Sequence, residues 1–85
     1  MAKLTSMMNI GREMERKLTS VGIDSAEALM LLGSRDAFSR LKARYPQVCL
    51  VHLYALEGAI QHVEFNCLSA DAKCALKAFY SEELR

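Results

Sequence analysis

Apolar residues recur every three or four positions along most of the chain, a spacing that predicts α-helices. Strict alternation of apolar and polar residues, the pattern of half-buried strands, is absent. We expect five helices: at about 12–20, from a cap at 24 or 25 up to 33, from a cap at 34 up to 46, at about 48–63, and after a cap at 69. The predicted fold class is therefore an all-α, compact five-helix domain.

The turn between the first two helices carries the clearest local signals. Gly22 supplies the left-handed residue that ends a helix, and Ile23 is expected to pack behind it. Asp24 or Ser25 then caps the second helix, and Glu27 suits a capping box with Asp24. This order of helix, tight turn and helix is typical of a helix-hairpin-helix, so we expect a SAM-like N-terminal half of that type.

The helix at about 48–63 is predicted to be the central one. Its apolar stripe is expected to face the core, and consists of Cys49, Leu53, Leu56, Ile60 and Val63. Gly58 inside a helix costs about 0.5–1 kcal/mol relative to Ala, so its expected use is to let a neighbouring helix approach closely. In the last helix the residues expected in the core are Ala72, Ala75, Leu76 and Phe79.

Composition narrows the function classes. The chain has 85 residues, of which 52% are hydrophobic and 25% charged, so residues 1–85 are expected to form one domain without a large enclosed cleft. No Ser-His-Asp order or carboxylate pair stands out, and we expect neither an enzyme nor a cofactor. The formal net charge of +1 provides no global basic field, so binding to nucleic acid would have to use a local patch.

The cysteines and the first residues of the chain suggest a cytoplasmic protein. Cys49, Cys67 and Cys74 are an odd number, and the chain begins without an apolar signal core, so reduced thiols are expected. Cys49 and His52 are spaced like metal ligands, but no paired Cys-x-x-Cys accompanies them, and we expect no metal site. No apolar run approaches the roughly 18 residues that span a membrane.

Several short segments, spread over nearly the whole chain, resemble a known family. They are Asn9-Ile10-Gly11, Val21-Gly22-Ile23, Gly33-Ser34 and, most specific of all, Leu53-Tyr54-Ala55-Leu56-Glu57-Gly58-Ala59. Together they resemble the C-terminal domain of the TfoX/Sxy competence regulators. The resemblance implies a small α-helical bacterial domain whose longer relatives help to switch on genes for DNA uptake, alongside the cyclic-AMP receptor protein. The N-terminal domain of those regulators is missing here, so we expect a stand-alone copy.

Two positions depart from the family pattern. His62 stands where many relatives have Gly, and Phe65 stands where Trp is common. We expect variations in packing at both.

The turn before the first helix and the basic third helix form the first candidate site. Backbone amides at a helix N-terminus, together with arginines, would suit a phosphate. Asn9 stands where DNA-binding hairpins usually have Gly, so a purely structural turn and a solvated basic helix are the alternatives. The candidate phosphate- or DNA-binding residues are Ile10, Gly11, Arg12, Arg16, Arg40 and Arg44.

The second candidate site is an apolar partner surface made of Met7, Met8, Met30 and Leu31. One small core cannot cover every apolar side chain of a short helix, and Met is favoured on surfaces that adapt to a partner. A fully buried short helix is the alternative.

Two functions are therefore expected, in this order. The first is a non-enzymatic regulatory or interaction domain of the competence-regulator type, acting through protein contacts with the transcription machinery or with a second copy. The alternative is a helix-hairpin-helix that binds nucleic acid through the 9–13 turn and the third helix, with an affinity that falls steeply as salt rises.

Overall fold

The computed structural model describes residues 3–83, and over that range the chain is all-α, with no strand. The elements are η1 (Leu4–Ser6), α1 (Arg12–Ser20), α2 (Ala26–Leu32), α3 (Ser34–Arg44), α4 (Leu50–Gln61), η2 (Phe65–Cys67) and α5 (Ala70–Glu83). The predicted fold class is confirmed, and α1 has the predicted bounds. The two short 3₁₀ turns, η1 and η2, were not predicted.

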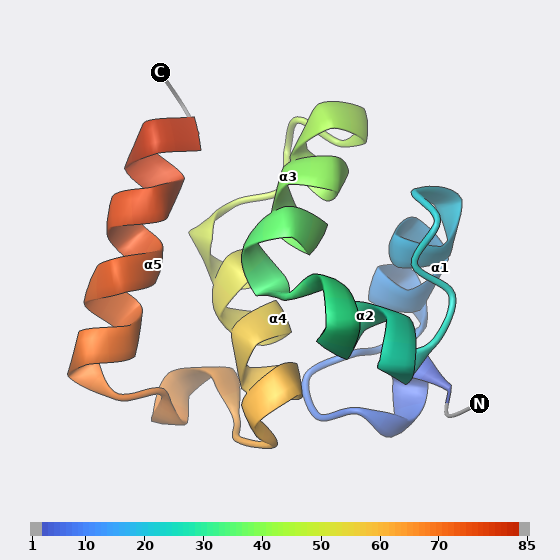
Figure 1. Ribbon diagram of the computed structural model, residues 1–85, viewed down its shortest axis with the longest axis horizontal. Helices are drawn as coiled ribbons and strands as arrows, with labels where there is room; N and C mark the ends of the chain where they lie inside the picture. The colour runs from blue at the N-terminus through green and yellow to red at the C-terminus, as the bar shows by residue number, and fades with distance from the viewer. Residues whose placement is uncertain (1–2, 84–85) are drawn as a thin grey trace.

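The helix that organises the fold is α3. It contacts α1, α2, α4 and α5, whereas α4 contacts α3, α5 and η2. In Figure 1, α3 and α4 occupy the middle of the molecule, with α5 on one side and α1 on the other. The predicted central place of the fourth helix is confirmed, and α3 shares it because the basic third helix also buries one face.

The core runs through all five helices and also includes the N-terminal segment. Phe38 is fully buried on α3, and its ring lies 5.8 Å from that of Tyr80 on α5. Leu4 and Met7, which lie in and just after η1, are buried too. These N-terminal residues pack in the core because the chain before α1 passes back across it.

Two residues predicted in the core are exposed. Cys49 precedes the first turn of α4 in an extended conformation, which takes its side chain off the helical stripe, and Val48 is buried instead. Ala75 is exposed on α5 because this helix packs on α3 and α4 through one face only, around Leu76.

The turn from α1 to α2 follows the sequence closely. Gly22 has φ of 89°, and the amides of Gly22 and Ile23 donate to Thr19 O and Leu18 O at 3.1 and 2.9 Å. This pattern is a Schellman motif, as predicted. Ser25, rather than Asp24, caps α2, because its hydroxyl accepts the Ala28 amide at 3.1 Å. Both α1 and α2 contact α3, and the helix-hairpin-helix description of this half stays a prediction.

Candidate functional site

The turn before α1 is fastened to the far end of α4 by one side chain. Asn9 has a left-handed backbone, with φ of 72°. Its Nδ2 donates to Val63 O at 2.9 Å and to Ala55 O at 3.4 Å, and its Oδ1 accepts the Phe65 amide at 3.2 Å. The side-chain amide of Asn9 therefore joins three segments of the protein and is not available to a phosphate.

Gly58 makes this joint possible. A Cβ built at Gly58 would lie 2.6 Å from Asn9 Nδ2 and 2.6 Å from Val63 O, distances that real Cβ atoms do not adopt. The close approach predicted at Gly58 is present, but the segments that approach are the N-terminal turn and the chain after α4, not a neighbouring helix. We call Asn9, Gly58 and Val63 the N-terminal joint.

The predicted phosphate-binding residues next to Asn9 are partly occupied by internal contacts. Ile10 is buried, and its amide donates to Met7 O at 3.3 Å, so Ile10 as a phosphate contact is contradicted by its place in the core. Gly11 is the N-cap of α1 in an extended conformation. Arg12 is exposed at the start of the helix.

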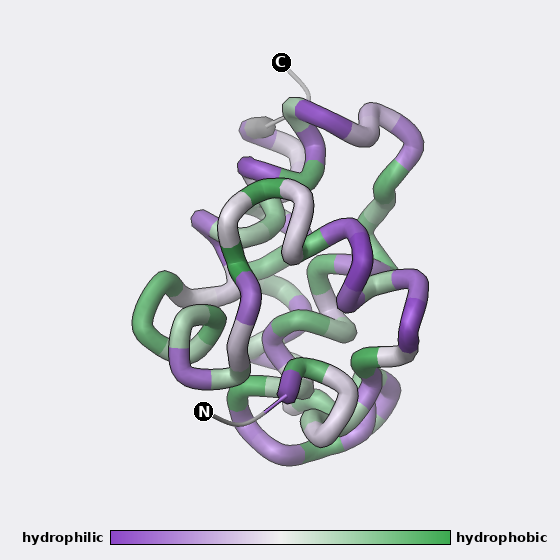
Figure 2. The backbone as a smooth tube through the Cα atoms, turned by 90° about the vertical axis from the view of Figure 1, so that its right-hand side faces the viewer, coloured by the Kyte–Doolittle hydropathy of each residue, from purple (hydrophilic) through white to green (hydrophobic). Residues whose placement is uncertain are grey.

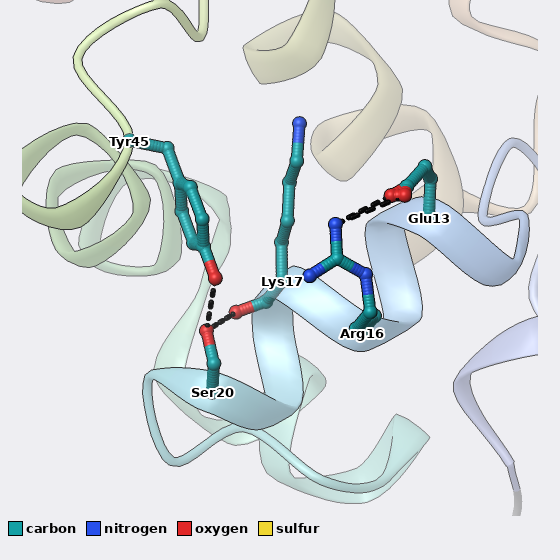
Figure 3. Close-up of polar contacts among 5 residues, drawn as sticks. All are labelled: Glu13, Arg16, Lys17, Ser20 and Tyr45. Carbon is teal, nitrogen blue, oxygen red and sulfur yellow. Dashed lines mark hydrogen bonds and ion pairs between the residues drawn. The ribbon is translucent and has the colours of Figure 1, made fainter.

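Arg16 forms an ion pair within its own helix. Its Nη2 lies 2.6 Å from Glu13 Oε1, and both side chains are largely exposed. The hydrogen bond from Arg16, reinforced by its charge, lowers the pKa of Glu13. Figure 3 shows the Arg16 guanidinium paired with Glu13.

The two remaining predicted cations, Arg40 and Arg44, lie on α3 where it meets α1, and Lys17 of α1 joins them there. Tyr45 follows α3, and its hydroxyl shares a hydrogen bond of 2.7 Å with Ser20 Oγ. Lys17 Nζ lies 5.5 Å, and Arg44 Cζ 5.8 Å, from the centre of the Tyr45 ring. One turn earlier on α3, Arg40 Nη1 donates to Val21 O at 3.3 Å. Figure 3 shows Lys17 alongside the Tyr45 ring.

A shallow hollow separates α1 from the start of α4. It has a volume of about 220 Å³ and is lined by Gly11, Glu13, Met14, Lys17 and His52. Burial, and secondly the positive charge of Lys17, lower the pKa of His52, whose Nδ1 accepts the Cys49 amide at 3.1 Å. No group of three or more His, Cys, Asp or Glu side chains in the described part of the chain is placed to hold a metal ion.

Three of the four residues of the predicted partner surface are exposed. Met7 is buried in the core, so its inclusion was wrong: the chain after η1 turns its side chain inward. Met8 and Met30 are 43% and 47% exposed, and Leu31 is 91% exposed. Figure 2 shows the end of α2 as a hydrophobic stretch that projects from the left side of the tube.

A groove runs between this end of α2 and α3. Its volume is about 250 Å³, and it is lined by Gly22, Ile23, Ala28, Leu31, Leu32 and Arg40. All of these residues except Arg40 are apolar or glycine, so the groove extends the exposed surface of Met30 and Leu31 toward α3.

The family can now be stated. Residues 1–80 match the family model of the TfoX C-terminal domain. This chain belongs to the TfoX C-terminal domain family. The family is one of regulatory domains and not of enzymes, and its association with competence and transcription regulation fits the predicted resemblance.

Two solved structures share the fold of this TfoX C-terminal domain. A crystal structure of an uncharacterized protein from Listeria monocytogenes has a TM-score of 0.93 at 37% identity, covering 95% of this chain and 92% of that chain. A tetragonal crystal form of a Listeria monocytogenes protein of unknown function has a TM-score of 0.91 at 36% identity, covering 94% and 98%. No curated protein matches.

The most specific stretch of the TfoX resemblance, residues 53–59, has structural roles. Leu53, Leu56 and Ala59 are buried, and Gly58 accommodates the N-terminal joint. Glu57 accepts a hydrogen bond of 2.5 Å from the hydroxyl of Ser34, which begins α3, and a second one from Gln61. Ser34 was predicted to cap α3, but it links that helix to α4. These residues identify the family without marking a ligand site.

The departure at His62 also has a structural explanation. His62 is the C-cap of α4 and is left-handed, with φ of 61°. Gly adopts this conformation without strain, so the Gly that the family resemblance implies at this position would suit the same cap. The expected variation in packing is therefore a variation in backbone preference.

None of the helices formed by residues 3–83 is both long and apolar enough to cross a bilayer.

Proposed function

We propose that this TfoX C-terminal domain is a non-enzymatic regulatory module of the competence-regulator type that acts by binding another protein through the exposed end of α2. The observation that carries this proposal is the 91% exposure of Leu31, beside the half-exposed Met30 and an apolar groove. Removing a Leu side chain from water is worth about 1.5–3 kcal/mol, and contiguous exposed apolar residues are typical of protein-binding surfaces.

The inner face of α2 packs in the core of the domain. Ala26 and Leu29 are buried, and the groove is formed where Ala28 and Leu32 are only half-buried. Leu31 therefore adds little to the core of the isolated domain, and its side chain is available for a partner.

Photo-crosslinking in the native cell tests this proposal. A photoreactive phenylalanine analogue at Leu31 is expected to give a discrete protein adduct, and the same analogue at Val51, which is 52% exposed on α4, serves as the matched control.

The double variant Met30→Lys, Leu31→Lys should keep its helical circular dichroism and lose the association. A folded double variant that associates unchanged would sink the proposal.

Binding to nucleic acid is the second candidate, and the cations at the α1–α3 edge favour it. Lys17 and Arg44 both lie beside the Tyr45 ring, and Arg40 is one turn before Arg44 on α3; cations of this kind contact phosphate backbones. The 9–13 turn supports this function less strongly, because the Asn9 side chain and the Ile10 amide are bonded internally.

Amide NMR during titration with short duplex DNA distinguishes this second candidate. Shifts confined to Lys17, Arg40, Arg44 and Tyr45, and weakened by added salt, would favour it. An unchanged spectrum at low salt would eliminate it.

A further inference from the structure

The groove between α2 and α3 contains a single charged side chain, and this feature indicates what kind of partner it fits. We propose that the groove binds an acidic amphipathic segment of a partner protein, with a large apolar side chain seated beside Leu31 and a carboxylate on Arg40. This inference deepens the proposed function and rests on it, because it names the chemistry of the partner at the same surface.

The size of the groove favours a side chain over a small molecule. Its volume of about 250 Å³ is below the roughly 300–1,000 Å³ of pockets that enclose drug-sized ligands. Ile23, which is buried beneath the groove, and the half-buried Leu32 provide an apolar floor, and Leu31 stands exposed at its margin. An anchoring side chain would thus be covered on both sides, as central anchors of protein interfaces are.

Arg40 is held at the groove by the main chain. Its Nη1 donates to Val21 O at 3.3 Å and lies 3.6 Å from the position of a Cβ at Gly22. A guanidinium has five N–H donors, so this one bond leaves most of them available. The α1–α2 turn therefore positions the charge before any partner arrives, which lowers the entropy cost of binding.

The charge of Arg40 calls for an acidic counterpart. Arg40 is exposed and forms no ion pair within the described part of the chain. Arg35 and Arg44 are exposed on the same helix, where Asp36 is the acidic neighbour. A carboxylate facing α3 would meet positive charge, and it would pair with the planar guanidinium through two hydrogen bonds. Charge complementarity thus selects an acidic segment over a basic one.

Selection from a random peptide library tests this specificity. The wild-type domain serves as bait, and peptides retained by the Leu31→Lys variant are discarded. The enriched peptides are expected to carry a large apolar residue with Asp or Glu within one helical turn of it. All three substituted domains used below should show the wild-type circular dichroism before binding is measured.

Affinities of the enriched peptides then assign the two contacts. Leu31→Lys should weaken binding by about 10- to 100-fold, and Arg40→Gln by about tenfold, whereas Val51→Lys should leave it unchanged. Replacing the peptide carboxylate by its amide should weaken binding to wild type but not to Arg40→Gln, because the pair is already broken there.

Other outcomes overturn the inference. Neutral or basic enriched peptides, no enriched peptides, or binding indifferent to Arg40→Gln would each do so. A Leu31-dependent dimer in sedimentation experiments would assign the groove to a second copy of this chain instead. The proposed function fails separately, when position 31 gives no adduct in the cell; a cellular adduct on a segment without acidic residues would overturn this inference alone.

Discussion

The N-terminal joint and the exposed end of α2 are opposites in how completely their groups are satisfied. At the joint, both polar atoms of the Asn9 side chain have partners, and there is no room for a methyl group on Gly58. At the end of α2, Leu31 is 91% exposed, and Arg40 has donors without a partner in the described chain. The first region connects distant parts of the chain, and the second leaves apolar surface and hydrogen-bond donors exposed.

This difference reverses what local motifs suggest. Residues 9–12 look like a phosphate-binding turn because they combine a turn residue, a Gly and an Arg before a helix. In the structure the turn residue is used to close the fold. A motif shows which conformation the backbone adopts, and only the surrounding contacts show whether its polar groups are free to bind a ligand.

The largest effect is expected from Asn9→Ala. The substitution removes the hydrogen bonds to Val63 and Phe65 and places Ala at a φ of 72°. We expect the free energy of unfolding to fall by about 2–4 kcal/mol, combining the lost bonds with the left-handed backbone cost. Urea unfolding followed by circular dichroism measures it.

Asn9→Gly separates the two causes, because Gly adopts the left-handed backbone without the side-chain bonds. It should be less destabilising than Asn9→Ala. Equal stability of Asn9→Ala and wild type would show that the joint does not hold the fold together.

The next largest effect is expected from Gly58→Ala. In an ordinary helix interior this change stabilises by about 0.5–1 kcal/mol. Here the added methyl group would collide with Asn9 Nδ2 and with the backbone oxygen of Val63, so we expect a net destabilisation of about 1–3 kcal/mol. Gly11→Ala is the matched control, because a Cβ at Gly11 meets nothing within 4 Å. Stabilisation by Gly58→Ala would mean that the joint yields easily.

The sequence was sufficient to predict those parts of the structure that depend on residues close together in the chain. The bounds of α1 and the Gly22 cap follow from signals within a few residues of one another. The place of Asn9 does not, because its partners Val63 and Phe65 are 54 and 56 residues away. The burial of Met7 is missed for the same reason, since no local period describes a segment that crosses the core once.

The exposed residues of the candidate site could be predicted from the sequence, but the groove beside them could not. The surplus of apolar residues at the end of α2 indicated that Leu31 would be exposed, and it is. The groove beside it depends on Arg40 reaching the carbonyl of Val21 in the α1–α2 turn, 19 residues earlier. Spacing within α3 placed Arg40 with Arg44 and gave no indication that it would border an apolar groove.

A smaller effect is expected from pH, at the hollow between α1 and the start of α4. Burial and the charge of Lys17 lower the pKa of His52 below 6.5, so the unfolded chain binds a proton more readily than the folded one. The stability that neutral His52 contributes is present above pH 6.5 and is lost as pH falls through the lowered pKa.

An NMR titration of the His52 ring should give a midpoint below 6.5, and Lys17→Gln should raise it. A wild-type midpoint at or above 6.5 would contradict the placement of Lys17 and His52 around one hollow.

The smallest effect on stability is expected from Leu31→Lys, and it sharpens the comparison most. A Leu that is 91% exposed has almost no packing to lose, so the free energy of unfolding should change by less than about 0.5 kcal/mol. Urea unfolding of this variant beside Asn9→Ala sets the two regions against each other in one assay. A loss as large as that of Asn9→Ala would mean that Leu31 packs within the domain in solution. An unchanged stability together with lost peptide binding would mean that the Leu31 side chain contributes to binding and not to folding.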